Sequence, residues 1–365
     1  MKKLVFVCVA AMSSFLAANC RGAVVTVDFQ TNGVSVGGAA IVSSVTGAFQ
    51  RVTCDGKRKE ILWRQFETMP DVCGTGLKAV VKAWAPENPP DYLVVDISNV
   101  PASASDTPTA SEVRYYPSVA FLPGGDVLDT RYRTTHLLLK KVLAKGKPFT
   151  MGETSGGTGD FSTPSCWSVT MTNNYYLGVF ELTQKQGFCL CGRTSTFTKD
   201  GDMRPFEKLG FTHFRDAANW GGDPHGSYPD APYINTGTPG YSSLLGCLNL
   251  RVAPLVFDLP SEAQWEFAAQ AGQPSGRLGN GMSRFPEYYS DLTGVVSPAM
   301  NASCRHSGNG MVNGKPELSN DPEFPNYDTD MGTAVCGTYP PNAYGFYDME
   351  GNVSEWCLDY YVKAD

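Results

Sequence analysis

The chain has 365 residues, which is enough for two domains that each bury a core of their own. Its net charge is -7, and it contains no run of Lys and Arg of the kind that binds nucleic acids, so DNA and RNA are excluded as partners. The 38 glycines and 25 prolines predict many turns and long loops rather than a bundle of helices.

Residues 1–23 have the pattern of an export signal peptide. Two lysines near the start precede an apolar stretch, Leu4 to Ala18, that is too short to span a bilayer. Cleavage after Ala18 and cleavage after Ala23 both remain open. Ordinary cleavage is favoured over lipidation of Cys20, because the residue before it is an Asn rather than a small residue. We expect an exported protein (periplasmic, secreted or at the cell surface) without a membrane span.

Export would allow disulfide bonds to form. Two of the 11 cysteines lie in the signal peptide, which leaves nine, and this odd number leaves at least one thiol without an intrachain partner. We expect Cys54 and Cys73 to pair within the first domain. For Cys189 and Cys191 a soft metal site stays open, but two buried or separately paired thiols are the favoured interpretation.

Residues 24–143 have the pattern of a β-rich domain. Short hydrophobic segments are separated by turn formers such as Asn32-Gly33 and Pro89-Pro90. The strand-like segments are residues 24–29, 79–84, 92–97, 113–122 and 132–139. We predict a small β-sandwich without a catalytic arrangement, which we interpret as an adhesive or spacer module of unknown role.

A change of composition around residues 140–147 marks a linker to a second domain, residues 147–365. Two capping boxes predict short helices that begin after Thr183 and after Ser261, because each hydroxyl can accept from the amide three residues later. In the second helix Trp265 shares a face with two alanines, and we expect that face to be buried.

The rest of the second half is rich in Gly, Pro, Asp, Asn and Tyr. Residues 192–257 and 273–340 are predicted to be long loops that packing, disulfides or bound ions hold in place. The four histidines have no metal-ligand spacing and are interpreted as structural or solvated: His136, His213, His225 and His306.

Four motifs follow one another in the second half. They are Met151-Gly152, Tyr-x-Gly-x-x-Glu-x-Thr within residues 176–186, Leu-Pro-Ser-Glu-Ala-Gln-Trp-Glu-Phe-Ala-Ala at residues 259–269, and a closing motif at residues 342–356. Together they resemble the sulfatase-modifying factor family, the formylglycine-generating enzyme domain. The resemblance implies a loop-rich variant of the C-type-lectin-like fold over residues 147–365. The expected fold class is therefore α+β, a β-sandwich-like domain followed by this domain.

Characterised members of this family oxidise a sulfatase cysteine to formylglycine, with oxygen and a copper(I) ion held by two cysteines. In the family these cysteines follow the closing motif. No residue of this sequence matches them, because Cys357 lies too early and Cys304 and Cys336 lie upstream, where we expect structural roles. We expect the chain to be a C-terminal truncation that lacks the last strands and the catalytic segment, and to be inactive as given.

The resemblance also implies two calcium sites, and calcium prefers hard oxygen ligands in irregular loops. In the closing motif Glu355 matches a carboxylate ligand. The matching backbone oxygen donors are those of Glu350, Gly351 and Val353. The positions that match the second site are Asn301, Ala302, Asp328 and Asp330. Judged without the family, the two aspartates would be solvated loop acids, and Glu355 would be either a ligand or a capping group.

Two functions are compatible with these observations. One is an oxidase of the formylglycine-generating type that modifies exported sulfatase polypeptides. The other is a non-catalytic, lectin-like binding or structural protein of the cell envelope, with glycans or polypeptides as partners. Aromatic residues in the long loops slightly favour the second function: Trp220, Tyr228, Tyr233 and Tyr241.

Overall fold

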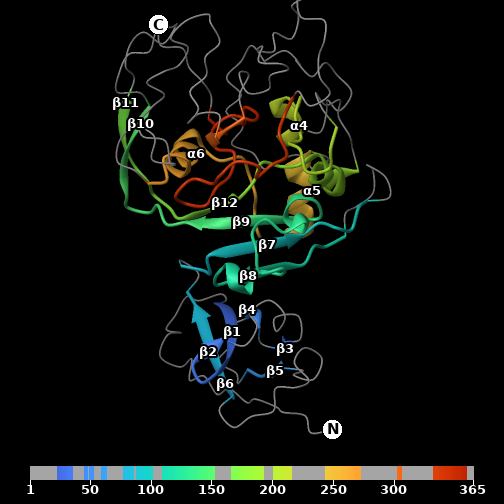
Figure 1. Ribbon diagram of the computed structural model, residues 1–365, viewed down its shortest axis with the longest axis vertical. Coiled ribbons are helices and arrows are strands. Elements are labelled where there is room, and N and C mark those ends of the chain that lie inside the picture. Colours follow the sequence, from blue (N-terminus) through green and yellow to red (C-terminus); the bar gives the residue numbers. More distant parts are fainter. Residues whose placement is uncertain are drawn as a thin grey trace, which may run out of the picture. The chain divides into compact units, whose positions relative to one another are not determined.

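The computed structural model describes the chain in separate stretches. They are residues 23–35, 45–47, 49–52, 59–63, 77–85, 88–101, 109–152, 166–192, 200–215, 243–272, 302–305 and 332–359. The described residues form a mixed α/β structure with few helices and several small sheets (Figure 1). The chain divides into two compact units. Unit 1 comprises Met1–Val95, Val113–Tyr132 and Leu138–Lys141, and unit 2 comprises Asp96–Glu112, Arg133–Leu137 and Val142–Asp365.

The first sheet of unit 1 is built around strand β1 (Ala23–Thr31). It pairs antiparallel with β2 (Val34–Ser35), β4 (Gln50–Val52) and β6 (Leu77–Trp84). The turn between β1 and β2 is Asn32-Gly33, and both residues have positive φ angles, 53° and 80°. Asn-Gly is the pair that a two-residue hairpin with this backbone favours, so the predicted turn is confirmed.

A second, two-stranded sheet covers the hydrophobic face of β1. Strands β3 (Val45–Gly47) and β5 (Ile61–Trp63) pair antiparallel. The ring of Trp63 stacks on that of Phe29, with 3.9 Å between the ring centroids. These aromatic residues, together with Val25 and Val27 of β1, belong to the core of this part of unit 1.

A four-stranded sheet has the strand order β12-β9-β7-β8. Its members are β7 (Tyr92–Asp96), β8 (Val113–Tyr116), β9 (His136–Val142) and β12 (Tyr175–Gly178). The predicted strand over residues 113–122 is wrong in its second half. The strand ends before Pro117, whose ring lacks an N–H for the sheet, and the 3-10 helix η2 (Val119–Phe121) follows. Residues 130–133 likewise form the 3-10 helix η3 (Thr130–Arg133) before β9 begins.

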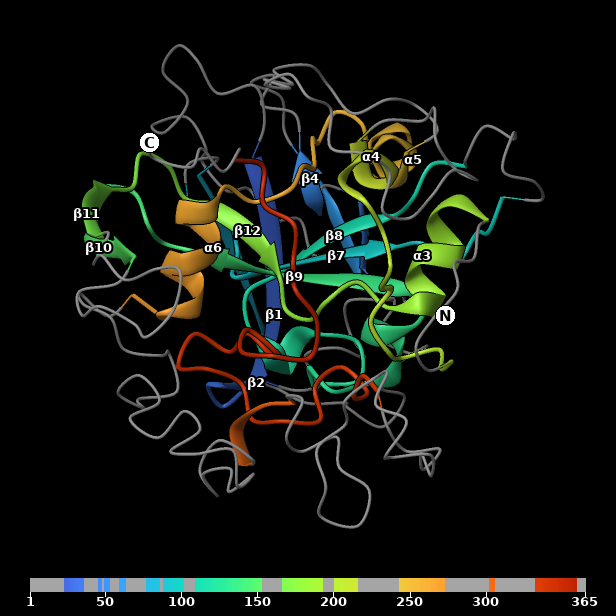
Figure 2. The same ribbon diagram turned by 90° about the horizontal axis from the view of Figure 1, so that it is seen from above.

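Unit 2 contains the hairpin of β10 (Pro148–Gly152) and β11 (Cys166–Thr170), together with the described α-helices. The helices are α3 (Gln184–Cys191), α4 (Phe211–Arg215), α5 (Leu244–Val252) and α6 (Glu262–Ala269). Helix α6 lies beside the hairpin in both ribbon views (Figures 1 and 2). None of the helices in these described stretches has the length and apolar character needed to cross a membrane.

Both predicted capping boxes are confirmed. The Thr183 hydroxyl accepts from the Gln186 amide at the start of α3, and Ser261 and Gln264 form the same reciprocal pair at the start of α6. The predicted buried face of α6 is confirmed for its two alanines, whereas Trp265 is only partly buried.

The core of unit 2 joins segments that are far apart in the sequence. Phe149 of β10 meets Phe267 of α6 edge to face, with ring centroids 5.3 Å apart, and Phe346 of the closing motif packs into the same cluster. The side-chain amide of Asn342 donates to the carbonyl of Ala268 at 2.8 Å. The closing motif is thereby anchored to the end of α6.

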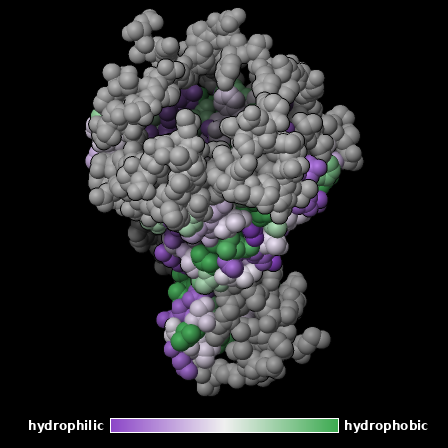
Figure 3. Space-filling model, turned by 45° about the horizontal axis from the view of Figure 1, so that its top comes forward, coloured by the Kyte–Doolittle hydropathy of each residue, from purple (hydrophilic) through white to green (hydrophobic). Residues whose placement is uncertain are grey.

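The described surface that faces the viewer in Figure 3 mixes hydrophilic and hydrophobic residues. Large hydrophobic side chains are exposed at separate places along the chain, including Val34 in unit 1 and Trp167 and Val256 in unit 2. Single exposed hydrophobic residues are normal on protein surfaces.

Candidate functional site

The site lies where the segment between β12 and α3 meets the closing motif. Before Glu181, the carbonyl of Val179 accepts from the backbone N–H of Tyr347 at 3.0 Å. After it, Thr183 is fixed by its capping box and by a hydrogen bond from its hydroxyl to the Arg133 carbonyl at 2.9 Å. Glu181 therefore projects from a short segment that is held at both ends.

Glu181 is 5% exposed and accepts three hydrogen bonds. Its Oε2 accepts from the side-chain amide of Asn352 at 2.6 Å and from the thiol of Cys336 at 3.4 Å. Its Oε1 accepts from the backbone N–H of Val353 at 3.2 Å. Through these contacts the segment between β12 and α3 is bound to Cys336 and to the closing motif, both more than 150 positions later in the sequence.

The backbone of the closing motif takes unusual conformations at this point. Asp348, Gly351 and Asn352 have φ angles of 55°, 84° and 57°. A Cβ at Gly351 would collide with the carbonyl oxygen of Arg305, which accepts from the Asn352 N–H at 2.8 Å. Glycine is therefore required at position 351 by both its backbone angle and the space available, and Asn tolerates the neighbouring position better than most residues.

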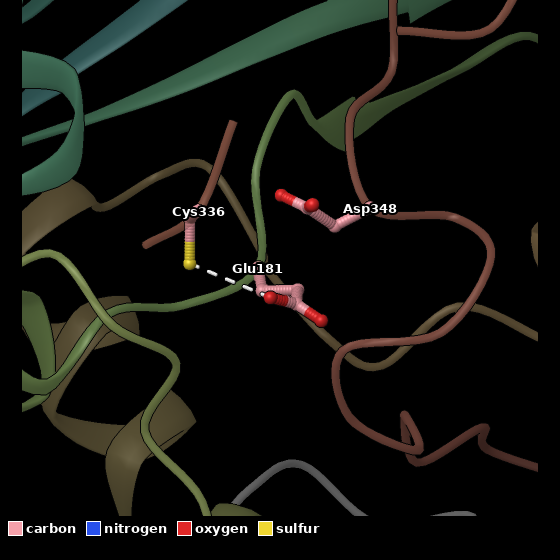
Figure 4. Close-up of side chains that lie close together, drawn as sticks. All are labelled: Glu181, Cys336 and Asp348. Carbon is pink, nitrogen blue, oxygen red and sulfur yellow. Dashed lines mark hydrogen bonds between the residues drawn. The ribbon is translucent and has the colours of Figure 1, made fainter. Parts of the chain in front are cut away.

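Cys336 and Asp348 complete a cluster with Glu181. Cys336 is fully buried, and its carbonyl accepts from Nη1 of Arg133 at 3.0 Å. Asp348 is 8% exposed, and its Oδ2 accepts from the backbone N–H of Gly337 at 2.6 Å. One ligand atom from each of the three side chains lies within 4.8 Å of the other two (Figure 4). We call this set the Glu-Cys-Asp cluster.

The electrostatics of the cluster favour protonated side chains. Burial raises the pKa of Glu181 well above its usual range, and the nearby Glu355 and Asp348 carboxylates raise it further. Burial also raises the pKa of Asp348 to about 6, and that of the Cys336 thiol well above its usual range. The three groups therefore hold protons more tightly than the same groups do in water, and Asp348, with a pKa of about 6, is mostly ionised at neutral pH.

The residues predicted to bind calcium lie in different surroundings. Glu355 is exposed, and its Oε2 accepts from the indole N–H of Trp265. The Glu350 side chain is partly buried, and burial raises its pKa to about 7. Three of the predicted ligands lie outside the described residues: Asn301, Asp328 and Asp330.

Segments that carry residues of the two different predicted calcium sites lie next to each other. Ala302 is exposed and belongs to the stretch 302–305, whose last residue forms a parallel bridge with Gly351. Val353 contributes its N–H to Glu181, and this bond fixes the backbone of the loop that leads to Glu355. The residues present supply oxygen donors of the kind that calcium accepts.

Some of the cysteines to which the sequence assigned roles lie in the described residues. Cys189 and Cys191 are buried in α3, and the Cys191 thiol donates to the Gly187 carbonyl at 3.3 Å, as the favoured interpretation of buried thiols requires. Cys54 and Cys73 lie outside the described residues. Copper(I) as the family holds it needs two thiolates, and the Glu-Cys-Asp cluster offers one thiol, so this cluster does not fit that ion.

Sequence reasoning gave no function to Glu181, Cys336 or Asp348. For Glu181 a signal was present, because an acid within Val179-Phe180-Glu181-Leu182, directly before a helix cap, stands in an otherwise apolar strand end. A charged residue in such a place is buried only when partners satisfy it. The partners themselves lie too far along the chain for a local pattern to identify them.

The sequence is similar to those of several known proteins. Residues 128–365 match the family described as "Sulfatase-modifying factor enzyme 1-like domain". The chain is 26% identical over 210 residues to the chaperone protein LppX of Paenibacillus barcinonensis, which covers 54% of this chain and 66% of that protein. It is 33% identical over 107 residues to the formylglycine-generating enzyme of Thermomonospora curvata and 30% identical over 106 residues to that of Mus musculus.

The two enzyme matches each cover 28% of this chain and only 27% and 22% of the relatives. Among solved structures, Treponema denticola variable protein 1 matches with a TM-score of 0.36 and 17% identity, over 63% of this chain and 75% of that one. The family match spans well over half of the sequence, and the chain therefore belongs to the family of the sulfatase-modifying factor enzyme 1-like domain.

Proposed function

We propose that this chain is an exported protein whose second unit recognises sulfatase polypeptides. Two formylglycine-generating enzymes are about 30% identical to it over 106 and 107 residues, and this supports the substrate class. The charged start and apolar stretch of residues 1–23 support export. A β-sandwich in unit 1 and a C-type-lectin-like fold in unit 2 belong to the same proposal.

The observation that favours recognition over oxidation is the composition of the Glu-Cys-Asp cluster. The three side chains supply one thiol and two carboxylates, without the second thiol that a redox pair or a copper(I) site would need. Their hydrogen bonds hold the closing motif against the segment between β12 and α3. A loop that is held in this way is suited to present a preformed binding surface, because little conformational entropy is lost on binding.

Calcium is the cofactor that we propose for the closing motif. Its ligands would be the side chain of Glu355 and the backbone oxygens of Glu350, Gly351 and Val353. A second site would use Asn301, Ala302, Asp328 and Asp330. The Trp265 N–H supports the first site, because it orients one of the two carboxylate oxygens of Glu355.

A second candidate function is the binding of polypeptides in general, without preference for sulfatases. It is favoured by the match to the chaperone protein LppX, which covers more of this chain than the matches to the formylglycine-generating enzymes do. Glycans of the cell envelope are a further class of ligand for such a module.

A peptide-binding experiment separates these functions. A fluorescent sulfatase-derived peptide with its modifiable cysteine is titrated with the purified chain, and the same residues in scrambled order serve as the control. We expect saturable binding of the sulfatase peptide and at least tenfold weaker binding of the scrambled peptide. Equal binding of both would favour the general polypeptide binder, and no binding of either would refute sulfatase recognition.

The same samples are then examined by mass spectrometry after incubation with oxygen and copper. An unchanged cysteine agrees with recognition without chemistry. Conversion of the cysteine to formylglycine would instead assign the oxidase function to this chain.

A further inference from the structure

The Glu-Cys-Asp cluster has the spacing of a metal site. Ligands at the usual 2.0–2.3 Å from a tetrahedral zinc ion lie roughly 3.4–3.8 Å from one another. The Sγ of Cys336 and the Oε2 of Glu181 are 3.4 Å apart, and the three ligand atoms all lie within 4.8 Å of one another. In Figure 4 the carboxylate of Asp348 points toward the other two side chains.

The donor set selects the kind of ion. Calcium and magnesium prefer sites made only of oxygen, and copper(I) prefers sulfur. One thiolate with two carboxylates suits a borderline divalent ion such as Zn²⁺, which binds both cysteine sulfur and carboxylate oxygen. The ion would therefore differ in class from the calcium proposed at Glu355.

A second observation concerns the oxygens of Asp348. Its Oδ2 accepts from Gly337, whereas no donor among the described residues forms a hydrogen bond with Oδ1. The Asp348 side chain is more than nine-tenths buried. Oδ1 is therefore an acceptor that a cation in the cluster can use without first breaking a hydrogen bond.

The charges of the cluster lead to the same conclusion. The guanidinium of Arg133, which donates to the Cys336 carbonyl, brings one positive charge toward a thiol and two carboxylates. A divalent cation would balance the remaining negative charge once the thiol is ionised. In that step the S–H bond of Cys336 breaks, a bond between Sγ and the metal forms, and the proton leaves to solvent without any oxidation or reduction.

We propose that Glu181, Cys336 and Asp348 bind a zinc-like divalent ion at the base of the closing motif. The ion would replace the proton that now lies between Cys336 and Glu181, and would join the β12–α3 segment to residues 332–359. A solvent molecule can supply the fourth ligand, as in zinc sites with three protein ligands.

Cobalt(II) is the probe for this site, because cobalt–thiolate bonds absorb in the near ultraviolet. The purified chain receives Co²⁺ both after folding and during refolding, since the cluster is buried. We expect one equivalent to bind, with a thiolate absorption band, release of a proton and displacement by Zn²⁺ but not by excess Ca²⁺.

Three variants locate the ion. Cys336→Ala should abolish the thiolate band, and Asp348→Asn should weaken Co²⁺ binding at least tenfold. The matched control Cys247→Ala removes another buried thiol, on α5, and should bind as the wild type does. Circular dichroism shows whether each variant folds. If Cys336→Ala does not fold, Asp348→Asn decides the question.

Several results would overturn the proposal. One is the absence of a thiolate band in the wild type under both loading conditions. Others are a band that persists in Cys336→Ala, unchanged affinity in Asp348→Asn, and equal loss of the band in Cys247→Ala.

Discussion

The carboxylate of Glu181 and the side-chain amide of Asn352 are joined by a hydrogen bond of 2.6 Å across 171 positions of sequence. The amide oxygen of Asn352 accepts from the backbone N–H of Ala334 at 2.8 Å. One side chain thus connects three segments of unit 2, and its own backbone has a φ of 57°. The stability of the closing motif is expected to depend on this residue.

Replacing Asn352 by Ala removes its side-chain hydrogen bonds to Glu181 and Ala334 and places a less tolerant residue at a positive φ. We expect a loss of about 3 kcal/mol in the free energy of unfolding of unit 2, measured by urea denaturation. Asn352→Gly is the control, because it removes the same side-chain hydrogen bonds but adopts the positive φ without strain. Its loss in the free energy of unfolding should be about 1 kcal/mol smaller than that of Asn352→Ala. Equal effects of the two changes would show that the backbone conformation contributes nothing.

A substitution at Gly351 tests its close contact with the Arg305 carbonyl, which lies in the stretch 302–305. Gly351→Ala puts a methyl group against the Arg305 carbonyl at a φ of 84°, and we expect a loss of about 3 kcal/mol or more. Gly146→Ala is the matched control, because Gly146 has a similar φ of 77° but no atom within 4 Å of an added Cβ. This control should lower the free energy of unfolding by only about 1 kcal/mol. Similar losses in both variants would argue against the close approach of Arg305.

The environment of Glu266 predicts that the free energy of unfolding depends on pH. Its Oε1 accepts from the Gly152 N–H at 2.8 Å and from the Gln270 side chain at 2.6 Å, yet burial raises its pKa above 4.5. The folded state therefore holds this proton more tightly than the unfolded state. Its contribution to stability is complete below pH 4.5 and is lost as the pH rises through the folded pKa.

The measurement compares denaturation curves between pH 4 and pH 8. Glu266→Gln should remove part of the rise in stability that the wild type gains on acidification. A Glu266→Gln curve parallel to that of the wild type would contradict the prediction.

Calcium should stabilise the folded chain through Glu355. A ligand present at 100 times its Kd adds about 2.7 kcal/mol, so a chelator should lower the Tm of the wild type. Glu355→Gln keeps an oxygen that can accept from Trp265 but loses the charge, and its Tm should not respond to the chelator. An unchanged wild-type Tm, or an equal response in Glu355→Gln, would refute the proposed ligand.

Local chemistry explains which parts of the fold could be predicted. Thr183 and Ser261 initiate helices because their hydroxyls and the following Gln side chains satisfy amides only three residues away. Asn32-Gly33 forms its turn for an equally local reason. The strand predicted over residues 113–122 failed because hydrophobicity continues past Pro117 while the hydrogen-bonding pattern cannot.

The Glu-Cys-Asp cluster could not be predicted in the same way. Cys336 and Glu181 are 155 positions apart, and their meeting depends on how the closing motif returns to the β12–α3 segment. The family resemblance directed attention to Glu355 and its neighbours, which carry matching residue types. It contained no information on a thiol beside two buried carboxylates.

The aromatic core of unit 2 has a consequence for synthesis on the ribosome. Phe149, Phe267 and Phe346 belong to one cluster, so its last member is translated almost 200 residues after the first. Contacts of such long separation form slowly, because the loop must be closed before any packing energy is gained. The nascent chain therefore carries an incomplete hydrophobic core until the closing motif has emerged, and during that interval it depends on protection from aggregation.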